Sequence, residues 1–492
     1  MIIALGVIFV ARFLGSVDYG AFAVVMIPTN IAILFQGVGV DIALTRFIAK
    51  YRSEGRKEDL WVITEAGLAF CLAFSLLIAG LLWSSSGWVA EYFLHDSSLE
   101  SLLQIASLAV VGNTLLTTVQ SILVGYERME LRNVTAIMWA VVKSIFSPLL
   151  VWLGLGPYGA VLGYSVGILL IGTLCVVLLY VYVRSDYGGA SLNRRRAFWM
   201  MFVFGLPLFM AMLVTGGLQQ LCHFLMALYV DKNLIGNYNA AMNFGVLVTV
   251  FTAPIAMALY PLFSKMSRGD DGLRIVFQSS VKYTTLITLP VTAALILLAD
   301  PVVNIIYGSG YQFTAFYLKL YLLAFLFAGV GNYSINSFFS GIGETRVSLN
   351  MNVISFVVGA PMAFLLIPSY GIVGMLVVHL VAPRVGVFYG LWWIKKTLGF
   401  SIETRSSLMI YVSVLAAYIG GFALLSLFSF NNWVSLFVGG GLFAGLYLLL
   451  LPVTGALTAF DLREFDAMSG GLGPLAPFIR LFVNLMRRLV KR

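Results

Sequence analysis

Apolar stretches long enough to form membrane helices follow one another along almost the whole chain, and the connections between them alternate in charge. Of the 30 Lys and Arg residues, 25 fall in every second connection, and the intervening connections hold only Arg12 and Lys232. Because positive residues are retained on the cytoplasmic side, this alternation predicts a multi-pass protein of the cell membrane with both termini in the cytoplasm. Buried helices of a large soluble protein would leave the alternation unexplained.

The composition agrees with a lipid environment. Hydrophobic residues make up 60% of the chain, charged residues only 10%, and the mean hydropathy is +0.97, which is more apolar surface than a globular interior can hide. The net charge of +9 lies in short cytoplasmic loops, so topology accounts for it and we expect no nucleic-acid partner. The three cysteines lack metal-ligand spacing, and we expect no metal and no cofactor.

Fourteen apolar segments predict an all-α integral membrane protein, and an even number of crossings places both ends on one side. The expected helices are Met1–Leu14, Tyr19–Leu44, Trp61–Ser84, Leu102–Gly125, Val134–Leu153, Tyr158–Val183, Trp199–Tyr229, Tyr238–Phe263, Tyr283–Ala299, Phe316–Gly341, Leu349–Ile367, Ile372–Ile394, Leu408–Phe428 and Trp433–Leu451.

The first six predicted helices and the next six share sequence landmarks at nearly constant offsets, which is typical of a duplicated transporter fold. Six is an even number, so the two halves have the same membrane orientation. We therefore expect two pseudo-symmetric six-helix lobes around a central cavity, with a substrate site between them. The matched landmarks are Gly20 with Gly236, Val111-Gly112-Asn113 with Val330-Gly331-Asn332, and Tyr158-Gly159 with Tyr370-Gly371, at offsets of 216, 219 and 212.

These landmarks divide the chain into four predicted parts. Residues 1–197 form the N-terminal lobe, residues 198–400 the C-terminal lobe, and residues 401–455 two appended helices. Residues 456–492 form a cytoplasmic tail. Its segment Pro474–Arg492 has one apolar and one basic helical face, so we expect a helix lying on the inner leaflet.

Several short motifs carry a resemblance to a known family. In their order and helix positions the motifs resemble those of the polysaccharide-exporter branch, the Wzx-type oligosaccharide flippases, of the multidrug/oligosaccharidyl-lipid/polysaccharide (MOP) flippase superfamily. The resemblance covers nearly the whole chain. The motifs are Ala11-Arg12-Phe13-Leu14-Gly15, Asp18-Tyr19-Gly20, the segment from Gly39 to Arg46, Gly236-x-Tyr238-x-Ala240-Ala241, Tyr260-Pro261 and the two Tyr-Gly-x-Val helix openings.

The resemblance implies a transporter rather than an enzyme. It implies alternating access that moves a polyprenyl-(pyro)phosphate-linked oligosaccharide from the cytoplasmic to the outer leaflet for surface polysaccharide biosynthesis. The partners would be this lipid-linked substrate, the bilayer, and glycosyltransferases or a polymerase of the same pathway. The glycan, the polyprenol, the coupling ion and the oligomeric state are left open.

Four cations lie within or at the edge of apolar segments, where a charge is unfavourable unless it faces a cavity or a partner. These cations are Arg12, Lys143, Lys319 and Arg384, and the sequence places no Asp or Glu at a comparable depth in the membrane. An anionic pyrophosphate ligand would neutralise this excess of positive charge. For Arg12 and Lys319 the alternative is a side chain that reaches the interface. For Lys143 and Arg384 it is a hydrogen bond to a carbonyl or tyrosine of a neighbouring helix.

Other polar groups in the apolar segments are candidates for sugar binding or for ion coupling. Interhelical hydrogen bonds are the alternative to sugar binding. For the acidic residues, the alternative to ion coupling is an ion pair with Arg46 or Lys57. The candidates for the substrate are Gln219, Gln220, Asn332, Asn336 and His223, and those for ion coupling are Asp41 and Glu65.

Two other functions compete with the flippase. A cation-coupled multidrug exporter of the same superfamily would favour acidic residues in its cavity, which the excess of buried cations disfavours. A membrane polysaccharide polymerase or ligase would need acid and base groups at the outer face. Its only candidates are Glu91, His95 and Asp96 in the longest outer connection, and a solvated loop accounts for these better.

Overall fold

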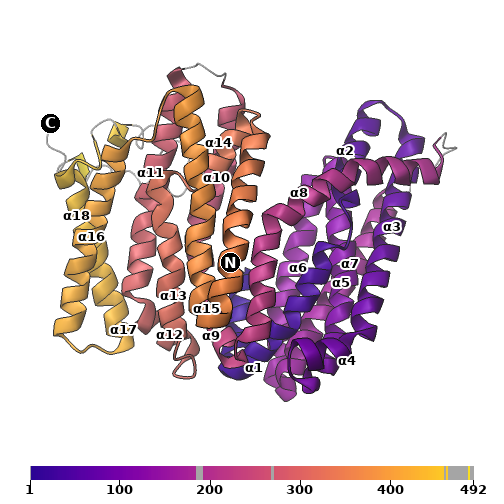
Figure 1. Cartoon of the computed structure of the whole chain (residues 1–492), viewed down its shortest axis with the longest axis horizontal. Coiled ribbons are helices and arrows are strands. Elements are labelled where there is room, and N and C mark those ends of the chain that lie inside the picture. Colours follow the sequence, from indigo (N-terminus) through magenta and orange to yellow (C-terminus); the bar gives the residue numbers. More distant parts are fainter. Residues whose placement is uncertain (1, 184–191, 267–270, 459–460, 464–485, 488–492) are drawn as a thin grey trace. The chain divides into compact units, whose positions relative to one another are not determined.

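The computed structural model describes residues 2–183, 192–266, 271–458, 461–463 and 486–487, and this part of the chain is helical without a β-strand (Figure 1). The elements are α1 (Ile2–Leu34), α2 (Val40–Ser53), α3 (Lys57–Ser84), α4 (Ser86–Trp88), η1 (Val89–Phe93), η2 (Ser97–Leu99), α5 (Glu100–Gly125), α6 (Met129–Leu150), η3 (Val151–Leu155), α7 (Gly156–Val183), α8 (Arg194–Tyr229), α9 (Lys232–Asn243), α10 (Gly245–Ser264), α11 (Asp271–Leu297), α12 (Ala299–Tyr307), α13 (Thr314–Leu323), η5 (Ala324–Val330), α14 (Ile335–Gly341), α15 (Thr345–Leu398), α16 (Thr404–Leu427), α17 (Asn432–Val434), η6 (Ser435–Gly439) and α18 (Gly440–Thr454).

The all-α membrane class is confirmed. Within the described residues, ten helices are long and apolar enough to cross a bilayer, or eleven if the bent pair Thr314–Val330 and Ile335–Gly341 forms one span. The count of fourteen crossings stays a prediction. The predicted interfacial helix of the tail falls almost entirely outside the described residues, apart from Met486 and Arg487.

Residue contacts divide the chain into two compact units. The first contains Met1–Asn243 together with Gly359–Val378, and the second contains Phe244–Val358 together with His379–Arg492. In the second unit, α16 and α18 lie side by side (yellow, Figure 1). The lobe and tail boundaries expected from the repeat stay predictions.

Three of the connections predicted between helices are breaks at glycine rather than loops. Gly15 interrupts α1 (φ 75°, ψ 173°), Gly156 opens α7 (φ 53°, ψ −141°) and Gly371 interrupts α15 (φ 56°, ψ −127°). Positive φ is unfavourable for a residue with a Cβ, so glycine allows the chain to change direction within a few residues. The breaks coincide with the expected short outer connections.

Two predicted helices are wrong in extent. The helix expected over Tyr19–Leu44 ends at Leu34, and α2 begins after Gly39 and runs through half of the predicted cytoplasmic loop. The helix expected over Phe316–Gly341 is divided into α13, η5 and α14, with a bend of 47° at the break before α14. Both errors arise because apolar content continues across the break, so a hydropathy pattern does not record where the backbone turns.

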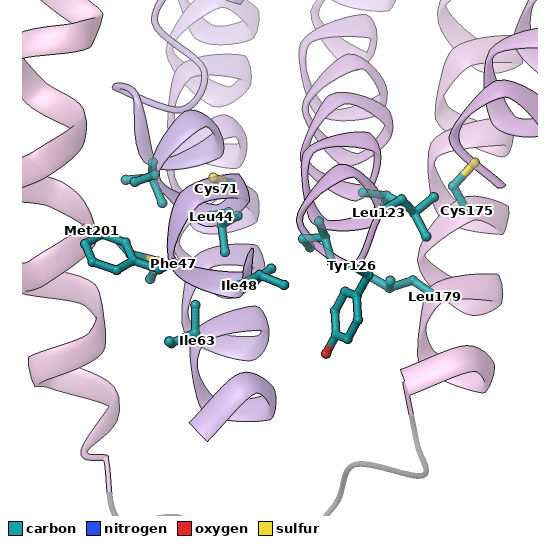
Figure 2. Close-up of a cluster of buried hydrophobic side chains, with 14 of the residues drawn as sticks. Leu44, Phe47, Ile48, Ile63, Cys71, Leu123, Tyr126, Cys175, Leu179 and Met201 are labelled. Atoms are coloured by element: carbon teal, nitrogen blue, oxygen red, sulfur yellow. The ribbon is translucent and has the colours of Figure 1, made fainter. Parts of the chain in front are cut away.

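The core of the first unit explains why α2 is a separate helix. Its residues Leu44, Phe47 and Ile48 are buried against α3, α5 and α8, whereas its basic residues lie on the opposite side. Figure 2 shows these side chains with Ile63 and Met201 from the neighbouring helices. The helix is therefore amphipathic and packs on the first unit without spanning the membrane. The three cysteines Cys71, Cys175 and Cys222 are free and buried, as expected for small packing residues.

The internal repeat is visible where α1 packs on α9 in the first unit. A Cβ added at Gly20 would overlap the carbonyl oxygen of Lys232, and one added at Gly236 would overlap that of Ser16. Both pairs, Gly20 with Gly236 and Ser16 with Lys232, are 216 residues apart. Each repeat thus makes the same contact to the other, which is the pattern that a twofold axis imposes.

The repeat does not extend to every landmark. Gly112 is helical in α5 and lies so close to α7 that an added Cβ would come within 2.5 Å of the Leu169 backbone nitrogen. The matched Gly331 instead has φ 84° and ends η5. The same Val-Gly-Asn sequence therefore supports close helix packing in one repeat and a broken helix in the other.

A buried carboxylate fastens the segment after α18 to α11 in the second unit. Asp461 accepts hydrogen bonds from Lys282 Nζ at 2.7 Å, from the Tyr283 hydroxyl at 3.1 Å and from the Thr458 amide and hydroxyl at 2.7 and 2.6 Å. Burial alone would raise the pKa of this carboxyl, but the hydrogen bonds from Lys282 and Thr458 lower it overall.

We expect Gly236→Ala to destabilise the first unit by about 1–3 kcal/mol, because the methyl group has no space against Ser16. The matched control is Gly445→Ala in α18, where an added Cβ meets no atom within 4 Å. Thermal unfolding of the purified protein in detergent should show a clear loss for the first variant and none for the second. Equal midpoints would contradict the close packing of α1 on α9.

We expect Asp461→Asn to lower stability by about 3 kcal/mol, because it leaves the buried Lys282 ammonium without its counter-charge. Since the folded-state pKa is lowered, the stabilisation is complete above the ordinary carboxyl pKa of about 4 and is lost as the pH falls through the folded value. The wild type should therefore lose stability relative to Asp461→Asn in acid. A constant difference between pH 7 and pH 3 would contradict this assignment.

Candidate functional site

The first unit encloses a cavity of about 300 Å³ between α1, α6, α7, α8 and α9. Its lining combines an apolar wall with several hydrogen-bonding groups and one cation, and it includes no Asp or Glu. The lining residues are Gly6, Val7, Val10, Tyr19, Phe22, Ala23, Met26, Ile27, Asn30, Lys143, Ser147, Tyr164, His223, Met226, Asn239 and Asn243.

Lys143 supplies the charge of this cavity. Its ammonium lies 5.0 Å from the ring centre of Tyr164 and 5.9 Å from that of Trp139, close enough for cation–π attraction. No carboxylate of the described chain forms an ion pair with it. A half-buried ammonium among aromatic and neutral groups favours an anionic ligand in the cavity.

Two glycines hold Lys143 at the cavity by bringing neighbouring helices close to α6. At Gly6 an added Cβ would overlap the backbone of Ser144, and at Gly163 it would lie 2.7 Å from the Cα of Ser147. The backbones of α1 and α7 therefore approach α6 closely within about one helical turn after the lysine. The side chain of Lys143 lies among the residues that line the cavity.

Neutral polar groups line the rest of the cavity. Asn243 donates to the Tyr19 hydroxyl at 3.2 Å, and Asn239 donates to the Ile235 carbonyl at 2.9 Å. Asn30 and His223 complete this set. Amide and hydroxyl groups can exchange hydrogen bonds with sugar hydroxyls or phosphate oxygens, so the cavity suits a ligand that is both anionic and rich in hydroxyl groups.

The sequence prediction included Lys143 and His223 but missed the other polar lining residues. The asparagines within apolar helices could have indicated a polar site, because a side-chain amide in lipid needs a hydrogen-bond partner or a cavity. The signal was weak, because several other asparagines lie in similar segments. Only the packing of helices from distant parts of the chain selects the lining set, whose polar members missed by the prediction are Tyr19, Asn30, Ser147, Tyr164, Asn239 and Asn243.

The other predicted ligand residues of the first unit lie outside this cavity. Arg12 is exposed on α1. Gln219 is exposed on α8, and the neighbouring Gln220 is half-buried, with a side-chain oxygen that is buried and lacks a hydrogen-bond partner. Neither glutamine lines the cavity beside Lys143.

Lys319 has a carboxylate partner, although the sequence analysis predicted none for it. Its ammonium lies 2.5 Å from Asp300, and both side chains are partly exposed. The aspartate had been assigned to a connection, and the fold brings the start of α12 next to α13. The expectation of four uncompensated cations is therefore wrong for Lys319.

Asn332 lies half-buried in the turn between η5 and α14.

Arg384 is buried in the second unit, with 8% of its surface exposed. It donates to the carbonyl of His379 at 2.6 Å and to the carbonyl of Ala324, and its guanidinium lies 5.2 Å from the Phe327 ring centre. This is the alternative in which the arginine bonds a carbonyl of a neighbouring helix. Its two terminal nitrogens are both engaged by the protein.

The two acids proposed for ion coupling have different surroundings. Glu65 forms an ion pair with Arg194 at 2.9 Å, rather than with Arg46 or Lys57. Arg46 instead lies 4.1 Å above the Phe204 ring. Asp41 is half-buried in the first turn of α2, and no cation of the described chain pairs with it.

The residues of a possible outer-face enzyme do not form a catalytic set. Asp96 caps η2 by accepting from the Ser98 amide at 2.9 Å, and it forms an ion pair with Lys232. The hydrogen bond from Lys232 lowers the pKa of Asp96, which makes this carboxylate a weak general base. In the described part of the chain, no three His, Cys, Asp or Glu residues gather as metal ligands would.

Comparison with known proteins agrees with these features. Residues 9–315 match the model of a family described as "Polysaccharide biosynthesis protein". The lipid II flippase MurJ of Bacillus subtilis is 21% identical over 84% of this chain and 85% of its own length.

Two solved structures have the same fold. Lipid II flippase MurJ in an inward closed conformation aligns with a TM-score of 0.75 over 92% of this chain and 96% of that one, at 18% identity. An inward-facing MATE family multidrug transporter of the MOP superfamily aligns with a TM-score of 0.63 over 80% and 95%, also at 18% identity. The family match spans more than half of the sequence, so the chain belongs to the family described as "Polysaccharide biosynthesis protein" and is a multi-pass membrane protein with the fold of these two transporters.

Proposed function

We propose that this protein moves a polyprenyl-(pyro)phosphate-linked oligosaccharide from the cytoplasmic to the outer leaflet of the cell membrane by alternating access. The observation that carries the proposal is the cavity of the first unit, where Lys143 is the only charged group among the lining residues. An anionic phosphate would neutralise the lysine, and the surrounding amides and hydroxyls match a sugar chain. The similarity to a lipid II flippase supports the same class of substrate.

The direction of transport rests on the charge alternation. With the basic connections in the cytoplasm, both termini lie there and the cavity accepts substrate assembled on that side. Glycosyltransferases or a polymerase of the same pathway would be the partners that supply and use the lipid-linked chain. Arg12, Gln219, Gln220 and Asn332 stay secondary candidates for substrate contact, and Asp41 and Glu65 for ion coupling. Lys319 and Arg384 are not among them, because Asp300 and backbone carbonyls bind these two side chains.

The alternative is export of cationic drugs coupled to an ion gradient, as the shared fold with a MATE transporter allows. The lining of the cavity disfavours it. A cationic drug would meet the ammonium of Lys143 and no carboxylate to bind it. Repulsion within a desolvated cavity is much stronger than in water, so the lysine selects against such ligands.

We expect Lys143→Ala to reduce flipping of a fluorescent polyprenyl-pyrophosphate oligosaccharide by at least about tenfold, because one charge-assisted phosphate contact contributes about 1.5–3 kcal/mol. Proteoliposomes would be assayed by the accessibility of the sugar to an added lectin. Lys143→Arg should retain part of the activity. Lys319→Ala is the matched control, since this lysine pairs with Asp300 and does not line the cavity.

Two outcomes would contradict the proposal. One is wild-type flipping by Lys143→Ala. The other is a wild-type protein that leaves the labelled lipid in place but dissipates a gradient of a cationic dye.

We expect Asn243→Ala to weaken transport about three- to tenfold, because it removes a neutral hydrogen bond worth about 1 kcal/mol from the cavity. The effect should appear in the substrate concentration needed for half-maximal flipping. Asn350→Ala, an exposed residue outside the cavity, should transport like the wild type. Equal effects of the two substitutions would contradict a substrate contact at Asn243.

A further inference from the structure

The second unit contains a membrane helix that is broken partway along its length. After α13 the backbone tightens into the 3₁₀ segment η5, and Gly331 then takes a left-handed conformation before α14 resumes at an angle of 47°. Breaks of this kind free carbonyl groups from regular helix bonding, and in lipid these groups must find other donors. Unwound carbonyls in transporters typically coordinate Na⁺ or another small cation.

Side chains of this protein satisfy the carbonyls of η5. The Tyr411 hydroxyl donates to Leu326, and the Ser407 hydroxyl donates to Gly329 at 3.2 Å. Both donors come from α16. Arg384 of α15 donates to Ala324, the first residue of the segment. The broken helix is therefore held along its length by donors from two other helices.

Arg384 also satisfies a carbonyl that its own helix leaves free. Proline has no amide hydrogen, so Pro383 provides no donor to the carbonyl four residues earlier, which belongs to His379. The guanidinium donates to this carbonyl at 2.6 Å. One cationic group thus joins a carbonyl freed by a proline in α15 to a carbonyl at the start of η5.

The surroundings of the guanidinium are those of a small-cation site. The two carbonyl oxygens point their negative ends at it, the face of Phe327 lies beside it, and the phenols of Tyr321 and Tyr333 are near enough to interact electrostatically. No carboxylate of the described chain forms an ion pair with Arg384. Oxygen dipoles and aromatic faces therefore stabilise the charge in place of an anion.

We propose that Arg384 is a permanent, covalently attached cation occupying a carbonyl-lined site at the broken helix, so that the second unit needs no free Na⁺ or K⁺ there. The arginine is a positioning residue for η5 and α14. Each of its two terminal nitrogens donates to a protein oxygen and its remaining nitrogen is buried, so protein oxygens rather than a substrate hold the guanidinium in place. The inference stands independently of which substrate is carried.

The test measures thermal unfolding of the full-length protein in detergent, followed by tryptophan fluorescence, in NaCl, KCl or choline chloride at equal ionic strength. The wild type should unfold at the same temperature in all three salts. Arg384→Ala should unfold at a lower temperature in choline chloride and regain at least about 2 °C, saturably, when Na⁺, K⁺ or millimolar guanidinium is added. Tetramethylammonium is too large to enter between the two carbonyls and should have no effect.

Tyr411→Phe is the matched control, because it removes another donor to η5 without removing a charge. It should lower the unfolding temperature without creating a response to any cation. Arg384→Lys keeps a tethered cation and should stay insensitive to Na⁺, which provides a second variant if the alanine variant does not fold. The proposal is overturned if the wild type or Arg384→Lys is stabilised specifically by Na⁺, or if Arg384→Ala responds to none of the small cations.

Discussion

The structure depends on the requirement that every charge and every freed carbonyl inside the bilayer finds a partner within the chain. Two lysines and one arginine meet this requirement, and a third lysine does not. Lys282 and Lys319 pair with Asp461 and Asp300, and Arg384 is bound by backbone oxygens. Lys143 has aromatic rings and a cavity but no anion from the described chain. Lys143 is therefore the charge that an anionic ligand would neutralise.

Lys143 and Arg384 looked equivalent in the sequence, since each is a single cation near the middle of an apolar segment. Packing separates them. Small residues on the helices beside Lys143 leave it facing a hollow, whereas a proline and a broken helix surround Arg384 with acceptors. In our proposals, the same chemical feature serves recognition in one unit and architecture in the other. A count of intramembrane charges cannot distinguish the two roles without knowing where the neighbouring carbonyls point.

Much of the fold could be predicted from the sequence because lipid makes hydrophobicity and loop charge strong signals. These signals gave the helical class, the repeat and the short glycine connections. They did not show that α2 is a short helix separate from α1, because apolar residues continue across the break between the two helices. Of the residues that line the site, only Lys143 and His223 were predicted. Its asparagines come from both ends of the first unit, and the Asp300 partner of Lys319 lies beyond a turn that hydropathy does not resolve.

The reciprocal glycine contact between α1 and α9 has a mechanical consequence. Backbone atoms that touch without intervening side chains have no rotamers that could yield to sliding, so the portion of α1 after Gly15 and the facing α9 should travel together as one stiff body. We therefore expect any bending that opens or closes the cavity to occur at Gly15, where α1 is broken. At this point the first half of α1, which contacts α6 at Gly6, would move relative to the second half.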